Sequence, residues 1–285
     1  DTAYKIYDDA AKMIPLQKIE ELSVLSHPNI VRPQSILLNA NNLPIGYSMQ
    51  LLKDTSPLVS LFAKSFKQRN HISNKNTVDL VQKLHALVAY VHSKKGTLII
   101  DLNELNFLTD GQFKEVYGID VNSYQTPSFP ATVIMDSIRD RHCNNKFNHN
   151  TDWFSFGILA FQMLIGVHPY KGNHPDFENV PKDERLNARM MKNISVLHKG
   201  TTIPKICEPF TTIPPALYKW FTYIFEEGGR RSPPTDYEII THIIPALVKE
   251  ITGTDLFDIN EMFQFDEEIG RVCSNGTTIL VVGQR

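Results

Sequence analysis

The chain has 285 residues, 42% of them hydrophobic, and its 29 lysine and arginine side chains against 31 acidic ones give a net charge of −2 at pH 7. This length can bury a large core in one domain or two lobes, and the balanced charge excludes the strong positive field that collects nucleic acid or binds an anionic membrane. No apolar run reaches the roughly 18 residues that span a bilayer, and the N-terminus lacks the basic start and apolar core of a signal peptide. Cys143, Cys207 and Cys273 lie far apart, which is typical of reduced thiols in a cytoplasmic protein.

The first 50 residues combine strand-like segments with one helical pattern. Alternating or β-branched residues predict strands at 2–7, 29–39 and 43–52, with asparagine-rich or proline-containing turns between them. Between residues 16 and 25, leucine or isoleucine recurs at every third position, which predicts a helix. We therefore expect a small β-rich lobe that carries one helix and is followed by a linker at 51–56.

Helical patterns dominate from residue 76 onward. The segment 76–93 has one apolar face and a cap at Asn76 or Thr77, and 151–166 is apolar on nearly all sides, as in a buried helix. Two further helices are expected at 214–227 and 235–251. A larger helical lobe is therefore expected to follow the β-rich one.

Polar residues interrupt apolar runs at two places beyond the first long helix. In LIIDLNELNFLTD, residues 98–110, Asp101 and Asn106 are five positions apart, and in VYGIDVNSYQ a short apolar run ends at Asp120. Both stretches are expected near the boundary between the two lobes, where ligand sites are common.

The spacing of Asp101 and Asn106 matches the catalytic loop of protein kinases, Asp-x-x-x-x-Asn. Other kinase-like segments follow in the family's order: AYKIY at 3–7, LSHPNIV at 25–31, YSMQLL at 47–52, DWFSFGILAFQMLIGVHPYKG at 152–172 and EEGGRRSPP at 226–234. From Ala3 to about Ile251 the sequence resembles the eukaryotic-like protein kinase superfamily, in particular divergent serine/threonine kinases of bacterial or phage type.

This resemblance implies an α+β, bilobal protein-kinase-like fold. Residues 1–52 are expected to form the small β-rich N-lobe without its first strands, and 53–252 the larger helical C-lobe. Residues 253–285 are a C-terminal extension, in which an Asn275-Gly276 turn and the β-rich TTILVV predict the start of a β domain.

The resemblance also implies roles for single residues in phosphoryl transfer. Lys5 is expected to contact the ATP phosphates, Asp101 to accept the proton of the attacking hydroxyl, and Asn106 and Asp120 to hold Mg²⁺ as well as line the nucleotide site.

The resemblance also implies that Met49 occupies the gatekeeper position and that Gln50 and Leu52 lie in the hinge that contacts the nucleotide. The helix acid that pairs with the kinase lysine falls at Lys18 by leucine spacing, so Glu21 is the expected substitute, with Glu20 as the alternative.

Several residues depart from the kinase pattern. Ile99 and Ile100 replace the His-Arg that usually precedes the catalytic aspartate, so control by phosphorylation of the activation loop is not expected. Asn103 stands at the catalytic-loop lysine, where it keeps a donor but no charge, and Val121-Asn122 replaces Phe-Gly after Asp120.

Two other kinase elements are also altered. Asp136 is expected to replace the glutamate that pairs with the structural arginine, here Arg231. Only four residues precede Lys5, so a glycine-rich loop either lies upstream of this sequence or is lacking.

These features leave three functions open. The first is an ATP- and Mg²⁺-dependent serine/threonine protein kinase whose protein substrate is unknown. The second is a pseudokinase that acts as a nucleotide-binding or scaffold module, and the third is a small-molecule phosphotransferase. His142, Cys143 and His149 lack the paired spacing of a zinc site.

Overall fold

The computed structural model describes residues 1–131, 134–144, 146–235, 237, 269–274 and 279–283. The chain divides into two compact units, Asp1–Ile240 and Thr241–Arg285. The first unit holds three-stranded sheets and helices, which confirms the expected α+β class. In the part of the chain that is described, no helix combines the length and hydrophobicity needed to cross a membrane.

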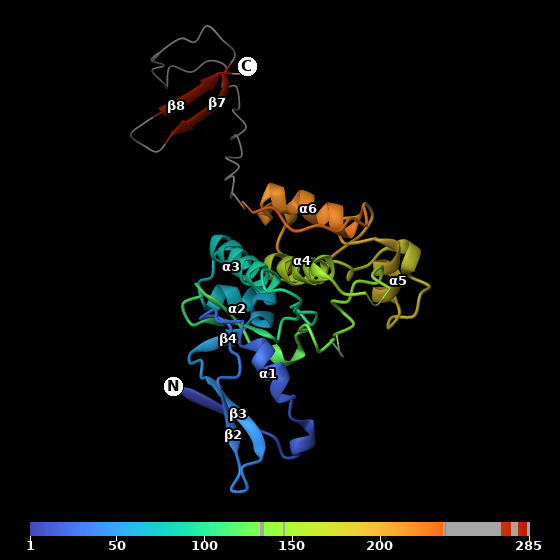
Figure 1. Cartoon of the computed structure of the whole chain (residues 1–285). Coiled ribbons are helices and arrows are strands. Elements are labelled where there is room, and N and C mark those ends of the chain that lie inside the picture. The colour runs from blue at the N-terminus through green and yellow to red at the C-terminus, as the bar shows by residue number, and fades with distance from the viewer. Residues whose placement is uncertain (132–133, 145, 236, 238–268, 275–278, 284–285) are drawn as a thin grey trace, which may run out of the picture. The chain divides into compact units, whose positions relative to one another are not determined.

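The small β-rich part is a three-stranded antiparallel sheet of β1 (Thr2–Ile6), β3 (Pro44–Gln50) and β2 (Ser35–Leu38), with β3 in the middle. The register places Ala3 opposite Met49 and Lys5 opposite Tyr47. The strand predicted at 29–39 is shorter than expected, because Pro33 lacks an amide proton and the ladder begins only at residue 35. The predicted helix forms as α1 (Leu16–Leu22), beside the sheet in Figure 1.

The helical part contains α2 (Lys64–Arg69), α3 (Asn74–His92), α4 (His149–Ile165), α5 (Arg185–Lys192) and α6 (Pro215–Phe225). The helices predicted at 76–93, 151–166 and 214–227 are present as α3, α4 and α6, whereas α2 and α5 were not predicted. Short 3₁₀ turns are η1 (Ala10–Lys12), η2 (Leu58–Phe62), η3 (Val121–Ser123), η4 (Pro175–Phe177) and η5 (Phe210–Thr212). The cap of α3 is Ser73, neither Asn76 nor Thr77, since Asn76 is the partner that completes a capping box with Ser73.

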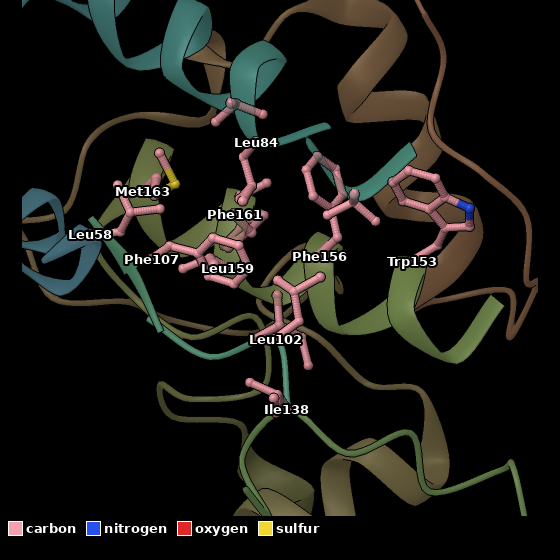
Figure 2. Packing of buried hydrophobic residues seen from close by; sticks show 14 of the residues in the cluster. Leu58, Leu84, Leu102, Phe107, Ile138, Trp153, Phe156, Leu159, Phe161 and Met163 are labelled. Atoms are coloured by element: carbon pink, nitrogen blue, oxygen red, sulfur yellow. The ribbon is translucent and has the colours of Figure 1, made fainter. Parts of the chain in front are cut away.

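The core of the first unit is built mainly around α4, which is buried along nearly its whole length. Leu84 of α3 and the α4 aromatics Phe156 and Phe161 belong to one cluster, which Leu102 joins from the loop that carries Asp101 (Figure 2). Leu102 is completely buried. The core therefore anchors the chain immediately after Asp101.

A second three-stranded sheet positions the candidate site. It consists of β4 (Thr55–Pro57), β5 (Phe107–Asp110) and β6 (Val116–Gly118), antiparallel and in that order. β4 lies in the expected linker, so the chain that leaves the small sheet pairs at once with the hairpin that follows Asn106.

The second unit is described only in part. β7 (Ile269–Ser274) pairs antiparallel with β8 (Ile279–Gly283). The predicted turn at Asn275-Gly276, nearly all of the helix expected at 235–251 and the proposed boundary at 252/253 lie outside the described residues.

Candidate active site

The β5–β6 hairpin brings Asn106 and Asp120 to the same end of the second sheet. Phe107 pairs with Gly118, and beyond this pair the Ile119 amide donates a hydrogen bond to the Asn106 carbonyl, with an N–O distance of 2.9 Å. Asn106 precedes β5 and Asp120 follows β6, so antiparallel pairing places them close together despite 14 positions of separation.

Asn106 is bonded to Asp101 through its side-chain amide. Nδ2 of Asn106 donates to the Asp101 carbonyl at 3.0 Å and to carboxylate Oδ2 at 3.3 Å. Oδ1 of Asn106 accepts no recorded hydrogen bond from the described residues. The geometry leaves that oxygen available as a ligand while the amide nitrogen fixes the loop.

Asn103 is almost completely buried, with 3% of its surface exposed. Its Nδ2 donates to Asp101 Oδ2 at 2.9 Å, and its Oδ1 accepts from the Leu105 and Asn106 amides. Asn103 was expected at the position of the catalytic-loop lysine, as a catalytic residue that keeps a donor but has no charge. The structure instead turns its amide into the loop, where it orients the carboxylate of Asp101.

The loop before Asp101 has a strained backbone that a distant carboxylate supports. Ile100 has φ 62°, a left-handed conformation that is a rare outlier for a β-branched residue. Asp152 of α4 is fully buried and accepts hydrogen bonds from the Ile99 amide (2.8 Å), the Ile100 amide (2.9 Å) and His92 Nε2 (2.9 Å). Asp152 therefore stabilises the bend that presents Asp101.

Asp120 also adopts a left-handed conformation, with φ 54°. Its carboxylate is half-exposed, and its Oδ1 lies 3.7 Å from the ammonium nitrogen of Lys5 on β1. This ion pair joins the small sheet to the turn after β6. Because both side chains are partly exposed, solvent weakens the pair, so its value lies in placing two opposite charges at one site.

A cavity of about 310 Å³ lies beside this ion pair. Five residues predicted to contact the nucleotide line it: Lys5, Met49, Gln50, Leu52 and Asp120. The remaining lining is mostly apolar, including Val31 and Leu108. Such a cavity, with a few polar groups at one side, is typical of a small-molecule site.

Glu21 lies elsewhere. Its carboxylate accepts a hydrogen bond from the Ser128 amide at 3.1 Å, and hydrogen bonding to Ser128 lowers the pKa of Glu21. Lys18 occupies the inward position of α1 and donates to the Asn122 carbonyl at 2.6 Å. The expected contact of Glu21 with Lys5 is therefore not formed. The side chain that α1 directs at the turn after Asp120 is that of Lys18, a cation.

The expected ion pair between Asp136 and Arg231 is not formed. Asp140 instead forms a two-pronged ion pair with Arg230, with distances of 2.6 and 2.7 Å. Burial alone raises the pKa of Asp140, but the bonds from Arg230 outweigh it and leave that pKa lowered. Asp136 contacts Arg141, and the Arg231 guanidinium lies 4.1 Å from the centre of the Tyr223 ring.

The donor set fits a magnesium ion. Asp120 and Asn106 offer hard oxygen ligands, and Mg²⁺ usually takes one or two carboxylates, with water and phosphate oxygens completing its shell. Among the described residues no group of three histidine, cysteine or acidic side chains is placed to hold a metal.

Sequence reasoning did not identify several cavity residues. Val31 reaches the cavity because its segment bonds to β6 through the Gly118 carbonyl (2.9 Å), and Leu108 follows Asn106 by two positions on β5. Tyr47 and Asn122 are joined by a 2.6 Å hydrogen bond that no local pattern indicates.

No family model matches the chain. It is 24% identical over 176 residues to cAMP-dependent protein kinase type 3 of Saccharomyces cerevisiae, covering 59% of this chain and 40% of that protein. It is 29% identical over 134 residues to protein kinase C delta type of Homo sapiens, covering 40% and 19%. The chain thus spans less than half the length of these curated relatives.

The solved structure of the PK-1 kinase of the Cydia pomonella granulovirus superposes with a TM-score of 0.54 at 11% identity, covering 79% of this chain and 77% of that one. This match confirms the expected protein-kinase-like fold. The fold and the sequence relatives together support the placement of this chain in the protein-kinase-like superfamily.

Proposed function

We propose that this chain binds ATP with Mg²⁺ and transfers the γ-phosphoryl group to serine or threonine hydroxyls of a protein. The observation that carries this proposal is the arrangement of four polar residues: Lys5 and Asp120 form an ion pair that lines the cavity. Asn106 does not line the cavity, but strand pairing places it next to the segment that carries Asp120, and it is hydrogen-bonded to Asp101. The similarity to protein kinases supports the same reaction.

The cavity has an apolar part and a polar part, and each suits one part of a nucleotide. Its apolar lining, with Met49 and Leu108, would hold the base, and Lys5 at its polar side would contact the phosphates. The Lys5–Asp120 ion pair is loose enough, at 3.7 Å, for the ammonium to turn to a phosphate oxygen.

Asp101 would act as the proton acceptor. As the substrate oxygen bonds to the γ-phosphorus, the bond from that phosphorus to the bridging oxygen of ADP breaks, and the hydroxyl proton passes to Asp101. An ionised carboxylate has about four acceptor sites, and the Asn103 and Asn106 amides and the Met135 backbone amide occupy three of them here. One site on Oδ1 remains for the hydroxyl.

Asn106 and Asp120 would hold the magnesium ion, which neutralises charge on the phosphate oxygens when it is bound. The residues of the chain fix these two ligands beforehand: Asn106 through its bonds to Asp101, and Asp120 through its position after β6.

A second candidate function is nucleotide binding without transfer. It is favoured by the buried, neutral Asn103, which leaves no cation from the catalytic loop to meet the γ-phosphate. It is also favoured by the 2.9 Å bond from the Met135 amide to Asp101 Oδ1, the oxygen that would accept the hydroxyl proton. In this case the same cavity would serve a scaffold.

Transfer of labelled γ-phosphate from ATP tests the proposal. The full chain is incubated with Mg²⁺ and three peptide libraries, in which serine, threonine or tyrosine is the only hydroxyl residue. We expect transfer to the serine or threonine library. Asp101→Asn should reduce this transfer by at least about 100-fold, the lower end for loss of a general base, and Asp120→Asn should reduce it through loss of a magnesium ligand.

The matched control is Asp79→Asn, which removes a half-exposed carboxylate of α3 whose ion pair, among the described residues, is with Lys75. This variant should transfer phosphate at the wild-type rate. ATP binding without transfer to any library would establish the second candidate instead. Transfer that both active-site variants retain in full would refute the assigned site.

A further inference from the structure

Lys18 is a buried cation in an unusual position. It projects from α1 with only 8% of its surface exposed, and its ammonium donates to the Asn122 carbonyl at 2.6 Å. No carboxylate of the described residues lies within ion-pair distance of it, since Glu21 on the same helix is bonded to Ser128. Burial lowers the pKa of Lys18, an effect that the charge of Glu21 partly offsets.

The side chain of Asn122 makes a second link to the small sheet. Its Nδ2 donates to the hydroxyl oxygen of Tyr47 at 2.6 Å, and a longer contact of 3.4 Å reaches Asp120 Oδ1. Tyr47 is 2% exposed and lies on β3 directly opposite Lys5. Three elements of the small lobe, β1, β3 and α1, therefore each contact the segment 120–122 with one polar side chain.

We propose that Lys18, Tyr47 and Asn122 form a clamp between the lobes that holds Asp120 in its left-handed conformation and so fixes the direction of its carboxylate. The proposal deepens the function above and rests on it in one respect, the role of Asp120 as a magnesium ligand. Lys18 is a positioning residue in this account, because it acts through the Asn122 carbonyl and does not line the cavity.

The need for a clamp follows from the backbone. A non-glycine residue in the left-handed region is strained and persists only when its surroundings over-determine it. Local bonds alone close the turn after Asp120: the Ser123 amide and hydroxyl both donate to the Asp120 carbonyl, at 3.2 and 3.0 Å. These bonds lie within the turn and do not orient it relative to the small sheet. The contacts from Lys18 and Tyr47 supply that orientation.

The clamp also accounts for two departures from the kinase pattern together. An acid at position 18 would repel the Asn122 carbonyl, whereas an ammonium donates to it. A glycine at position 122 would keep that carbonyl but lose the amide that reaches Tyr47. Lys18 and Asn122 are thus complementary, and Lys5 is free to pair with Asp120 because no helix acid competes for it.

Amide hydrogen exchange of the full chain without nucleotide tests the clamp independently of activity. Lys18→Met keeps the length of the side chain and removes its donor, and Tyr47→Phe removes one hydroxyl with little change in shape. Lys18→Arg retains a donor, and Lys12→Met is the matched control at an exposed lysine.

We expect Lys18→Met to accelerate exchange of the Ser123 and Tyr124 amides by about tenfold, consistent with loss of one charge-assisted bond of about 1.4 kcal/mol or more. Tyr47→Phe should accelerate the same amides less, whereas Lys18→Arg and Lys12→Met should leave them near the wild-type rate. Amides of the α4 core should not change. Unchanged exchange in Lys18→Met, or equal acceleration across α4, would overturn the clamp.

ATP affinity, measured with and without Mg²⁺, links the clamp to Asp120. Mg²⁺ should raise the ATP affinity of Lys18→Met by a factor about tenfold smaller than in the wild type. Lys18→Arg should show the wild-type effect of Mg²⁺. A wild-type protein that binds no ATP would refute the proposed function, while the exchange data still decide the clamp. Faster exchange with an unchanged Mg²⁺ effect would show that the clamp orders the turn without positioning Asp120, and would overturn that half of the inference.

Discussion

Replacement of Asp152 by asparagine tests how the catalytic loop is supported. The carboxylate of Asp152 accepts three hydrogen bonds in a fully buried position: Oδ2 from the Ile99 amide and His92, and Oδ1 from the Ile100 amide. Asparagine has nearly the same shape but only one acceptor oxygen. If that oxygen keeps the Ile99 and His92 bonds, the new amide nitrogen faces the Ile100 amide, so two donors meet.

The expected cost can be worked out from this geometry. The Ile100 amide loses the one acceptor that it has among the described residues. A hydrogen bond to a charged group contributes about 1.5–3 kcal/mol, and a buried donor left unsatisfied costs about 1–3 kcal/mol more. Because these two figures overlap in part, we expect Asp152→Asn to lower the free energy of unfolding by about 3 kcal/mol. Ile100 is also the strained residue, so relaxation of its backbone would displace Asp101.

Urea unfolding, followed by circular dichroism, measures this loss, with Asp183→Asn as the matched control at an exposed acid in the loop before α5. The control should change stability by less than about 0.5 kcal/mol. A loss below about 1 kcal/mol in Asp152→Asn, or exchange of the Ile100 amide as slow as in wild type, would refute the idea that Asp152 holds the loop.

Three other outcomes follow from buried groups. His168 donates to the Ser137 carbonyl and accepts from the Tyr170 amide, and burial lowers its pKa to about 4, so it folds in the neutral form. The unfolded state therefore binds the extra proton, and the free energy of unfolding should fall by about 2 kcal/mol from pH 7.5 to pH 5; His168→Gln should flatten this slope in urea titrations. The lowered pKa of Asp140 gives stability that is full above about pH 4 and is lost as the pH falls through its folded value; scanning calorimetry at pH 2–5 should show this loss reduced in Asp140→Asn. Arg230→Lys keeps the charge but loses the two-pronged geometry, and should lower the free energy of unfolding by about 1–3 kcal/mol, whereas Arg231→Lys should cost less than half as much.

The sequence predicted the elements that have strong periodicity. The helices α3, α4 and α6 were expected because their apolar positions repeat along one face or, in α4, on all sides. Asp101 and Asn106 were expected in one loop because their spacing matches that of the kinase catalytic loop, and the structure joins them by two hydrogen bonds. Their roles in phosphoryl transfer stay a prediction.

The errors fall where long-range contacts decide between similar residues. Arg230 and Arg231 are neighbours, and only the fold shows that Arg230 reaches Asp140 while Arg231 lies over Tyr223. Glu21 was preferred to Lys18 because the kinase pattern requires an acid there. The actual partner of Lys18 is a backbone carbonyl 104 positions away, which has no signature in sequence.

Asn103 shows a third kind of difficulty. Its residue type permits a donor toward a phosphate as well as a local turn, and asparagine often bonds to the backbone two residues ahead. In the structure Asn103 forms the local turn: its Oδ1 accepts from the Leu105 amide and its Nδ2 donates to the Asp101 carboxylate. The backbone conformation of Ile100 could not be predicted either, because Asp152 lies 52 positions away in the sequence.

We propose that Lys5, Asn106 and Asp120 belong to one site for ATP and magnesium. Isothermal titration of the full chain with ATP, with and without Mg²⁺, measures whether this site exists. We expect binding at one site that Mg²⁺ strengthens by about tenfold or more. Asp120→Asn should remove this strengthening, and Lys5→Met should weaken binding under both conditions. Absence of ATP binding at millimolar concentration, or an undiminished Mg²⁺ effect in Asp120→Asn, would show that these residues do not form such a site.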